Sequence, residues 1–60
     1  MEKKRVFRQD YISLREKIKF NGGDVATIIE ENKPNIVFKV DEKAYLLPYR
    51  DFIITTKQIS

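Results

Sequence analysis

The side chains of this chain best suited to acid–base chemistry are its carboxylates, because the sequence contains no His and no Cys. Two acidic pairs, Glu30-Glu31 and Asp41-Glu42, are adjacent in sequence. Adjacent residues of a strand point to opposite faces of a sheet, so neither pair converges on one substrate. We interpret these carboxylates as charges of solvated turns and edges, and we expect no enzyme activity, no metal site and no cofactor.

The basic side chains give the strongest indication of a function. Cations gathered on one surface attract phosphates and release the counterions of a nucleic acid. Lys17 and Lys19 share the outward face of one predicted strand, and Lys39 is outward on another. We expect a nucleic-acid-binding surface, for DNA or RNA, made by the basic residues Arg5, Arg8, Arg15, Lys17, Lys19 and Lys39.

Two tyrosines, Tyr11 and Tyr49, are assigned to the same surface. Aromatic faces stack on unpaired bases regardless of their sequence. The alternative role of a tyrosine in so short a chain is to fill the core or its rim, and both roles stay open.

The charge is distributed unevenly along the chain. The net charge of the 60 residues is +3, and it lies in residues 1–15, which carry five basic and two acidic side chains. Residues 16–60 carry seven of each and are balanced. We expect residues 1–10 to form a basic N-terminal arm, frayed over residues 1–5, in front of a single domain at residues 11–60.

A second function class remains open beside nucleic-acid binding. Val37 and Leu46 alternate out of register with the expected core positions, so they lie on the surface as a contact patch. Small sheets also have free edges that pair with a partner strand. The balanced charge of residues 16–60 suits a protein-interaction module or homo-oligomeric adaptor, whereas the basic N-terminal region favours nucleic acid slightly.

Neither a membrane span nor a leader is expected. No apolar run approaches the length that crosses a bilayer, and no apolar stretch follows the charged N-terminus, as it would in a secretory signal. We expect a cytoplasmic protein with no membrane partner. The absence of cysteine excludes disulfides, so a core of this size depends on efficient packing or on self-association.

From residue 16 onward the sequence predicts five short strands. Ile18 and Phe20 alternate with lysines, and the turn residues 21–24 (Asn-Gly-Gly-Asp) suit a tight hairpin. Strands at 25–31, 36–41 and 44–47 follow, separated by turns at 32–35 and 41–43. Residues 48–51 suit a single helical turn after Pro48, and residues 52–56 are a β-branched and aromatic fifth strand. Residues 11–14 are either a short helix or an ordered segment that enters the first strand, and we favour the latter.

This order of elements resembles small SH3-like barrels, including the KOW-type domains of transcription and translation proteins. The resemblance covers residues 14–56 and rests on LREKIKFNGGDVATIIE (14–30) and NIVFKVDEKAYLLPYRDFII (35–54). Short bacterial and phage proteins have the same layout. The resemblance implies an all-β, five-stranded SH3-like barrel, and no position is carried over as a binding residue.

The predicted protein is therefore a non-enzymatic binding protein, a small regulator or accessory factor. Its core should contain the apolar residues of the alternating strands: Leu14, Ile18, Phe20, Val25, Ile28, Ile36, Phe38, Val40, Leu47, Phe52 and Ile54.

Overall fold

A computed structural model describes residues 3–59 and shows a mostly β domain, which confirms the predicted fold class at that level. The helix α1 has only 7 residues, and no helix of the described range has the length and apolar character to span a bilayer. The elements are β1 (Lys4–Phe7), β2 (Tyr11–Ser13), β3 (Ile18–Phe20), β4 (Val25–Asn32), β5 (Asn35–Val40), β6 (Lys43–Pro48), α1 (Tyr49–Thr55) and β7 (Thr56–Gln58).

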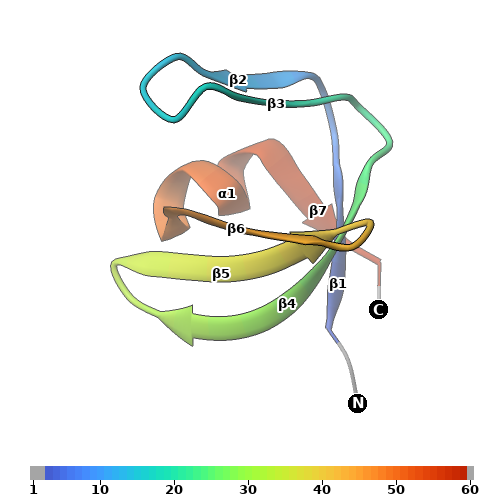
Figure 1. The fold of residues 1–60 in the computed structure, drawn as a ribbon. Coiled ribbons are helices and arrows are strands. Elements are labelled where there is room, and N and C mark those ends of the chain that lie inside the picture. The colour runs from blue at the N-terminus through green and yellow to red at the C-terminus, as the bar shows by residue number, and fades with distance from the viewer. Residues whose placement is uncertain (1–2, 60) are drawn as a thin grey trace.

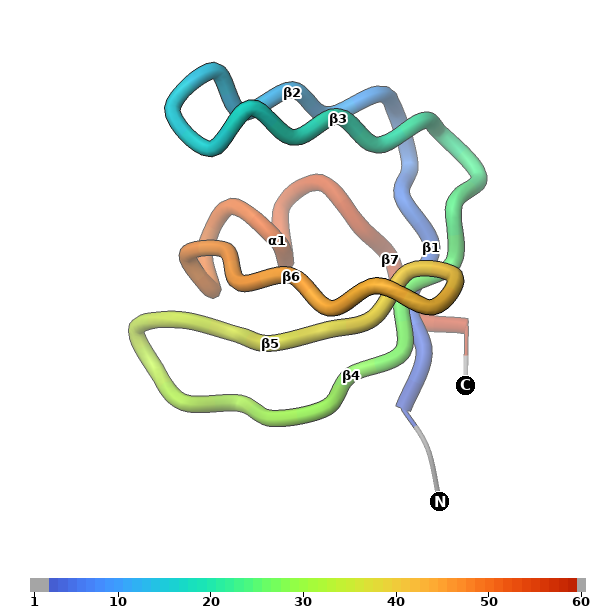
Figure 2. The backbone as a smooth tube through the Cα atoms, viewed as in Figure 1, coloured from blue at the N-terminus to red at the C-terminus, as the bar shows by residue number. Residues whose placement is uncertain are grey.

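The strands form two sheets (Figure 1). The larger is antiparallel, with the order β6-β5-β4-β1-β7, and the smaller is the β2–β3 hairpin. In Figure 2 the hairpin lies at the top, and α1 lies between it and β4–β5. The predicted single closed barrel of five strands is therefore corrected to seven strands in two sheets over residues 3–59.

The strand β1 corrects the prediction of a separate basic arm. Lys4–Phe7 lies inside the larger sheet, with Lys4 opposite Thr27 of β4 and Phe7 opposite Thr56 of β7. Phe7 is 2% exposed, and its ring stacks on Phe20 with the centroids 4.6 Å apart. A buried aromatic side chain anchors this strand, although most of its residues are charged or half-exposed. Residues 1 and 2 of the predicted arm lie outside the described residues.

The turn at residues 21–24 does not form the predicted hairpin. β3 pairs with β2, and the turn carries the chain from the smaller sheet to the larger one. Gly23 has φ 99°, a conformation that favours glycine, and a Cβ on Gly22 would lie 3.3 Å from Cα of Gln9. Polar groups of the turn itself and of β1 close this turn. On the β1 side, the Gly23 N–H donates to the Phe7 carbonyl oxygen at 2.8 Å.

The next two predicted turns are confirmed as hairpin connections. Asn32 pairs with Asn35 around the β4–β5 turn, and Val40 pairs with Lys43 around the β5–β6 turn. The β4–β5 register shifts between Ile28 and Glu30, which marks a β-bulge. Ile29 at this irregularity is 54% exposed, whereas Ile28 packs against the core.

The helix α1 is longer than the single turn predicted, and it replaces most of the predicted fifth strand. Pro48 precedes it, where its missing N–H costs no helical hydrogen bond. Phe52 and Thr55 are buried at the i and i+3 spacing of a helix face, and Ile54 between them is 62% exposed. The β-branched run at 53–56 favours a strand locally, but burial of Phe52 overrides that propensity.

The buried core confirms six of the eleven predicted residues, namely Phe20, Ile36, Phe38, Val40, Leu47 and Phe52. Ile18 and Ile28 are partly buried against it. Three predicted core residues are exposed and the prediction was wrong for them: Leu14 (86%), Val25 (44%) and Ile54 (62%). Phe7, Ala26, Thr55 and Thr56 are also buried, although the sequence pattern did not predict them as core residues.

Phe7 is expected to matter more to stability than Leu14, although Phe7 lies in the predicted arm and Leu14 in the predicted core. Phe7→Ala should lower the free energy of unfolding by about 3–5 kcal/mol, because it empties the centre of the core. Leu14→Ala should change it by less than about 0.5 kcal/mol, since that side chain is solvated. Urea denaturation followed by circular dichroism measures both, and equal losses would contradict this assignment.

Candidate nucleic-acid interface

The β2–β3 hairpin brings three of the predicted cations onto one element. We call residues 11–20 the basic hairpin. Arg15 and Lys17 lie in its turn and Lys19 on β3, and all three are exposed. Lys19 pairs with Ile12 on the outward face, while Tyr11 pairs with Phe20 on the side that meets the core. The alternation of β3 therefore points Lys19 away from the core. The prediction that Lys17 shares the outward face of this strand is wrong, because Lys17 lies in the turn before β3, with φ 57°.

Two large apolar side chains accompany these cations. Ile12 is 59% exposed on β2, and Leu14 is 86% exposed at the start of the turn. The turn is held by a hydrogen bond from Glu16 N–H to Ser13 Oγ at 3.3 Å, and Lys17 adopts φ 57°. The surface is thus cationic and apolar at once. Ile12 was not assigned to a site from the sequence and Leu14 was placed in the core, because alternation alone did not reveal which sheet would cover them.

Arg8 precedes the basic hairpin in the chain and is not part of it. It is exposed in the connection between β1 and β2, and its backbone N–H donates to the Thr55 carbonyl oxygen at 2.9 Å. Residues 8–20 carry four basic side chains against Asp10 and Glu16, so this segment is net positive. Asp10 is occupied in the fold, because its Oδ1 accepts the Gly22 N–H at 2.8 Å.

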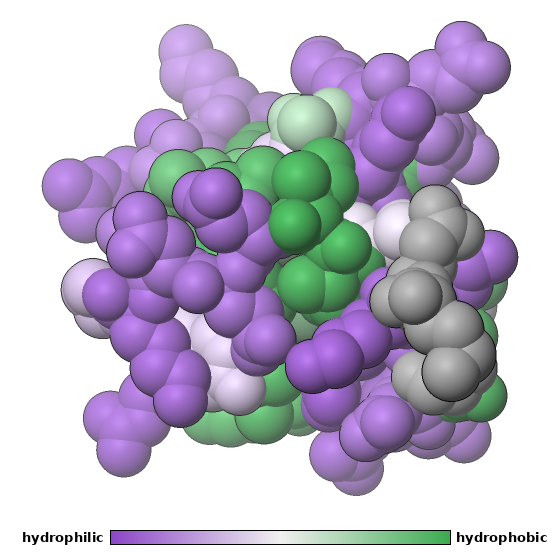
Figure 3. Space-filling model, turned by 90° about the horizontal axis from the view of Figure 1, so that it is seen from below, coloured by the Kyte–Doolittle hydropathy of each residue, from purple (hydrophilic) through white to green (hydrophobic). Residues whose placement is uncertain are grey.

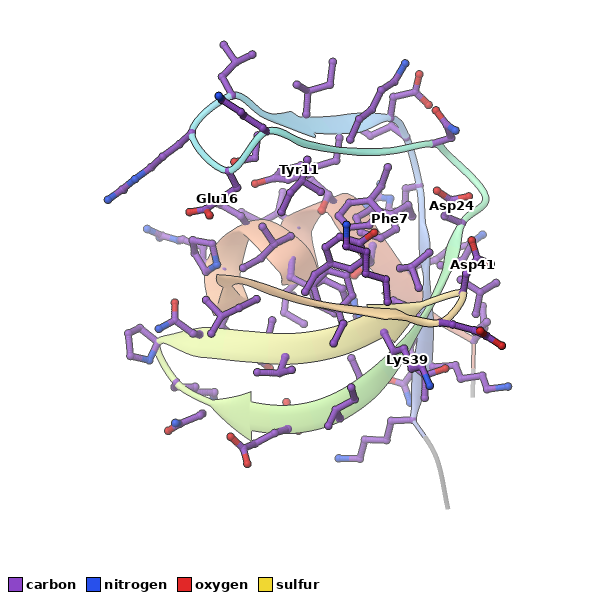
Figure 4. All side chains as sticks on the ribbon, viewed as in Figure 1. Phe7, Tyr11, Glu16, Asp24, Lys39 and Asp41 are labelled. Carbon is purple, nitrogen blue, oxygen red and sulfur yellow. The ribbon has the colours of Figure 1, made fainter. Side chains whose placement is uncertain are left out.

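Lys39 does not join the basic hairpin. It is exposed on β5, in register with Thr27 of β4 and Ala44 of β6. In Figure 4 Lys39 lies beside β4 and β5, whereas Tyr11 and Glu16 lie beneath the hairpin. Its place in the sheet separates it from the cations at the top of the molecule.

Arg5 has a role inside the fold. It is partly buried, and its Nε donates to Thr56 Oγ1 at 2.7 Å. Its Nη2 donates to the carbonyl oxygens of Thr56 at 3.0 Å and Ile53 at 3.5 Å. These bonds tie β1 to the end of α1, where helical carbonyl groups lack partners within the helix. The guanidinium is therefore engaged within the fold by Thr56 and Ile53, and Arg5 is not part of the basic hairpin.

The two assigned tyrosines are half-buried and lie apart from one another. Tyr11 packs against the core, 6.4 Å from Phe7 between ring centroids. Burial raises the pKa of its phenol from 10.0, the carboxylates of Asp51 and Glu16 raise this pKa further, and a hydrogen bond with Ser13 lowers it. Tyr49 begins α1, with Lys33 Nζ 4.7 Å from its ring centroid. Only Tyr11 belongs to the basic hairpin, and its ring faces inward.

A pocket of about 220 Å³ gathers a second set of cations, which sequence reasoning did not recognise as a group. Lys3 Nζ lies 3.7 Å from Glu31 Oε2 at its rim, and Ile28, Ile36 and Ile53 are among its apolar residues. Lys3 and Lys4 join it because β1 lies within the sheet, a pairing that the sequence pattern did not predict. The residues that line it are Lys3, Lys4, Arg5, Ile28, Glu31, Ile36, Tyr49, Ile53 and Gln58.

Val37 and Leu46 face outward from the larger sheet, as the alternation predicted. They are cross-strand partners on β5 and β6, with Leu46 54% exposed and Val37 half-buried. Seen from below, the molecule shows a group of hydrophobic residues surrounded by polar ones (Figure 3).

Within residues 3–59, no three acidic side chains lie close enough together to hold a metal ion.

Replacement of Arg5 is expected to destabilise the fold. Arg5→Ala should lower the free energy of unfolding by about 1–3 kcal/mol, because it leaves partly buried carbonyl oxygens without donors. Arg8→Ala is the matched control and should have an effect below about 0.5 kcal/mol, since the Arg8 side chain is exposed. Thermal melts of both variants test this, and a similar shift in the two would refute the structural role of Arg5.

Alkaline pH should weaken the fold through Tyr11. The folded state favours the neutral phenol, so this stability is present below the unfolded pKa of 10.0 and is lost as the pH rises through the raised folded pKa. Tyr11→Phe keeps the ring and removes the titration. Urea denaturation at about pH 9 and about pH 11 should show a smaller loss for the variant. Equal losses would mean that ionisation of Tyr11 is not linked to folding.

Comparison with known proteins assigns no family and no function to this chain. No protein-family model, curated protein or solved structure matches the chain. The case for a function therefore depends on the described residues themselves. Among them, the basic hairpin carries three exposed cations within five residues of the chain, at Arg15, Lys17 and Lys19.

Proposed function

We propose that the protein is a non-enzymatic nucleic-acid-binding protein that acts as a small regulator or accessory factor through its basic hairpin. The observation that supports this is the exposure of Arg15, Lys17 and Lys19 within five residues of one projecting element. Arg8 precedes this element in the chain and adds a fourth cation. The proposal narrows the predicted surface, because Arg5 and Lys39 are held elsewhere in the fold.

The proposed contact is mainly with phosphates. Each cation that neutralises a phosphate releases counterions, so binding should weaken steeply as salt is added. A two-stranded β-ribbon also has dimensions that enter the major groove of DNA. Ile12 and Leu14 would then contact sugars or the apolar edges of bases, which removes their exposed surface from water.

We further propose that the two sheets are a variant of the SH3-like fold. A hairpin inserted between β1 and β4, two tight hairpins, and a short helix before the last strand support this. The likeness of residues 14–56 to KOW-type domains favours the same arrangement. Such domains occur in transcription and translation proteins, and we propose the cytoplasm as the compartment where this chain meets its nucleic acid.

A binding titration tests the proposed function. Fluorescence anisotropy with labelled duplex DNA, single-stranded DNA and single-stranded RNA compares the wild type with the triple variant Arg15→Gln, Lys17→Gln, Lys19→Gln. The affinity of the variant should fall about tenfold or more at low salt, and the slope of log K against log salt should fall by about 2–3.

The matched control removes the same charge elsewhere, through Lys39→Gln, Arg50→Gln and Lys57→Gln, all exposed residues. This control should bind within a factor of about three of the wild type if the site is local. An equal loss in both variants would indicate a diffuse attraction and not a site. Failure of the wild type to bind any of the three probes at low salt would end the proposal.

A further inference from the structure

The strand β6 has a free edge. In the larger sheet it is the first strand of the order β6-β5-β4-β1-β7, so it pairs with β5 on one side only. Its residues are largely exposed, including Ala44 and Leu46. A free edge presents N–H and C=O groups to any strand that approaches it.

The register identifies which groups are free. Tyr49 N–H donates to the Pro34 carbonyl oxygen at 2.7 Å, just beyond the pair Asn35–Pro48. In an antiparallel ladder, bonded and non-bonded pairs alternate, so Leu47, Tyr45 and Lys43 bond to β5. Ala44 and Leu46 therefore direct their N–H and C=O away from the sheet, and within the described part of the chain neither has a hydrogen-bond partner there.

The outward side chains of this edge strand between Lys43 and Leu47 are apolar. Leu46 projects from the outer face of the sheet beside Val37, and it is 54% exposed. The neighbouring outward residue on β6 is the small Ala44. The edge thus offers unpaired backbone groups next to the apolar pair Val37–Leu46, and the outward charge beside them is Lys39, the β5 partner of Ala44.

We propose that β6 pairs with β6 of a second copy of this chain, antiparallel about a two-fold axis at Tyr45, so that the larger sheets of the two copies become continuous. In this register the Ala44 N–H donates to the Leu46 carbonyl oxygen of the other copy, and the Leu46 N–H of the other copy donates to the Ala44 carbonyl oxygen. The two-fold axis repeats this pair of hydrogen bonds. All free backbone groups of these two residues are then satisfied.

Self-complementarity favours a second copy over an unrelated strand, and two further features favour the proposed register. The same pair of residues supplies donors and acceptors on both sides, which is the self-complementarity that a two-fold interface needs. A shift by two residues sets Pro48 opposite Ala44, and the Ala44 carbonyl then lacks a donor because proline has no N–H. The proposed register also sets Leu46 against the small Ala44, which brings the Val37–Leu46 pairs of both copies together on one face.

The expected dimer is a weak one. An interface of one edge strand and one apolar pair is smaller than the roughly 1,200 Å² that stable complexes bury. Association should therefore depend on concentration. The proposal does not depend on the basic hairpin, although a dimer would carry two such hairpins and gain avidity on a long nucleic acid.

Sedimentation velocity across protein concentrations from about 10 µM to about 1 mM tests the association, a range that covers weak interfaces. The wild type should shift from monomer to dimer. Leu46→Lys should stay monomeric, because it places a charge in the apolar contact. Ile29→Lys is the matched control, since Ile29 is also 54% exposed but lies on β4, and it should dimerise as the wild type does.

Two further measurements locate the contact. Amide hydrogen exchange by NMR should show protection of Ala44 and Leu46 that increases with concentration. Ala44→Pro removes one free N–H without removing a bond to β5, and it should abolish the dimer while circular dichroism keeps the wild-type spectrum. A wild type that stays monomeric throughout, or a dimer in which these amides stay unprotected, overturns the proposal, whether or not the hairpin binds nucleic acid.

Discussion

The packing of four phenylalanines is the interaction on which the rest of this structure depends. They are all the phenylalanines of the chain, and they come from β1, β3, β5 and α1. Phe7 and Phe20 lie 4.6 Å apart between ring centroids, and Phe38 and Phe52 lie 4.5 Å apart. Because the two sheets have no shared ladder among the described residues and the chain has no cysteine, these rings provide the contact that holds hairpin, sheet and helix together.

This packing also decides which charges are available to a partner. Phe7 draws β1 into the sheet, which turns Arg5 toward the carbonyl oxygens at the end of α1. Phe20 holds one face of the basic hairpin against the core, so period-two alternation points Lys19 outward. The functional surface is therefore a consequence of core packing. The basic residues near the N-terminus are therefore divided among three places. Arg5 bonds within the fold, Lys3 and Lys4 line the pocket, and Arg15 lies in the basic hairpin.

Parts of the fold could be predicted because they depend on neighbours in sequence. The hairpins at 32–35 and 41–43 follow from turn residues between alternating apolar runs, and Ile36, Phe38 and Val40 are buried as their alternation requires. The exposure of Lys19 was predicted for the same reason, whereas Lys17 is exposed because it lies in the turn before β3. The turn at 21–24 misled the prediction, because its glycines fit a hairpin as well as a link between two sheets. Residues 53–55 favour a strand by local propensity, but they lie in α1, which buries Phe52 and Thr55.

The sequence by itself determined a small β domain without disulfides, its two central hairpins, most of its aromatic core and the alternation that exposes Lys19. These features depend on local backbone preference and on the period of two in each strand. Tertiary structure alone decided that β1 lies between β4 and β7, that Arg5 bonds within the fold, that Leu14 is solvated and that the edge of β6 is free. Those outcomes depend on which strands pair across long stretches of chain. That pairing depends on how the phenylalanine rings of distant segments are buried together, which a local sequence pattern does not reveal.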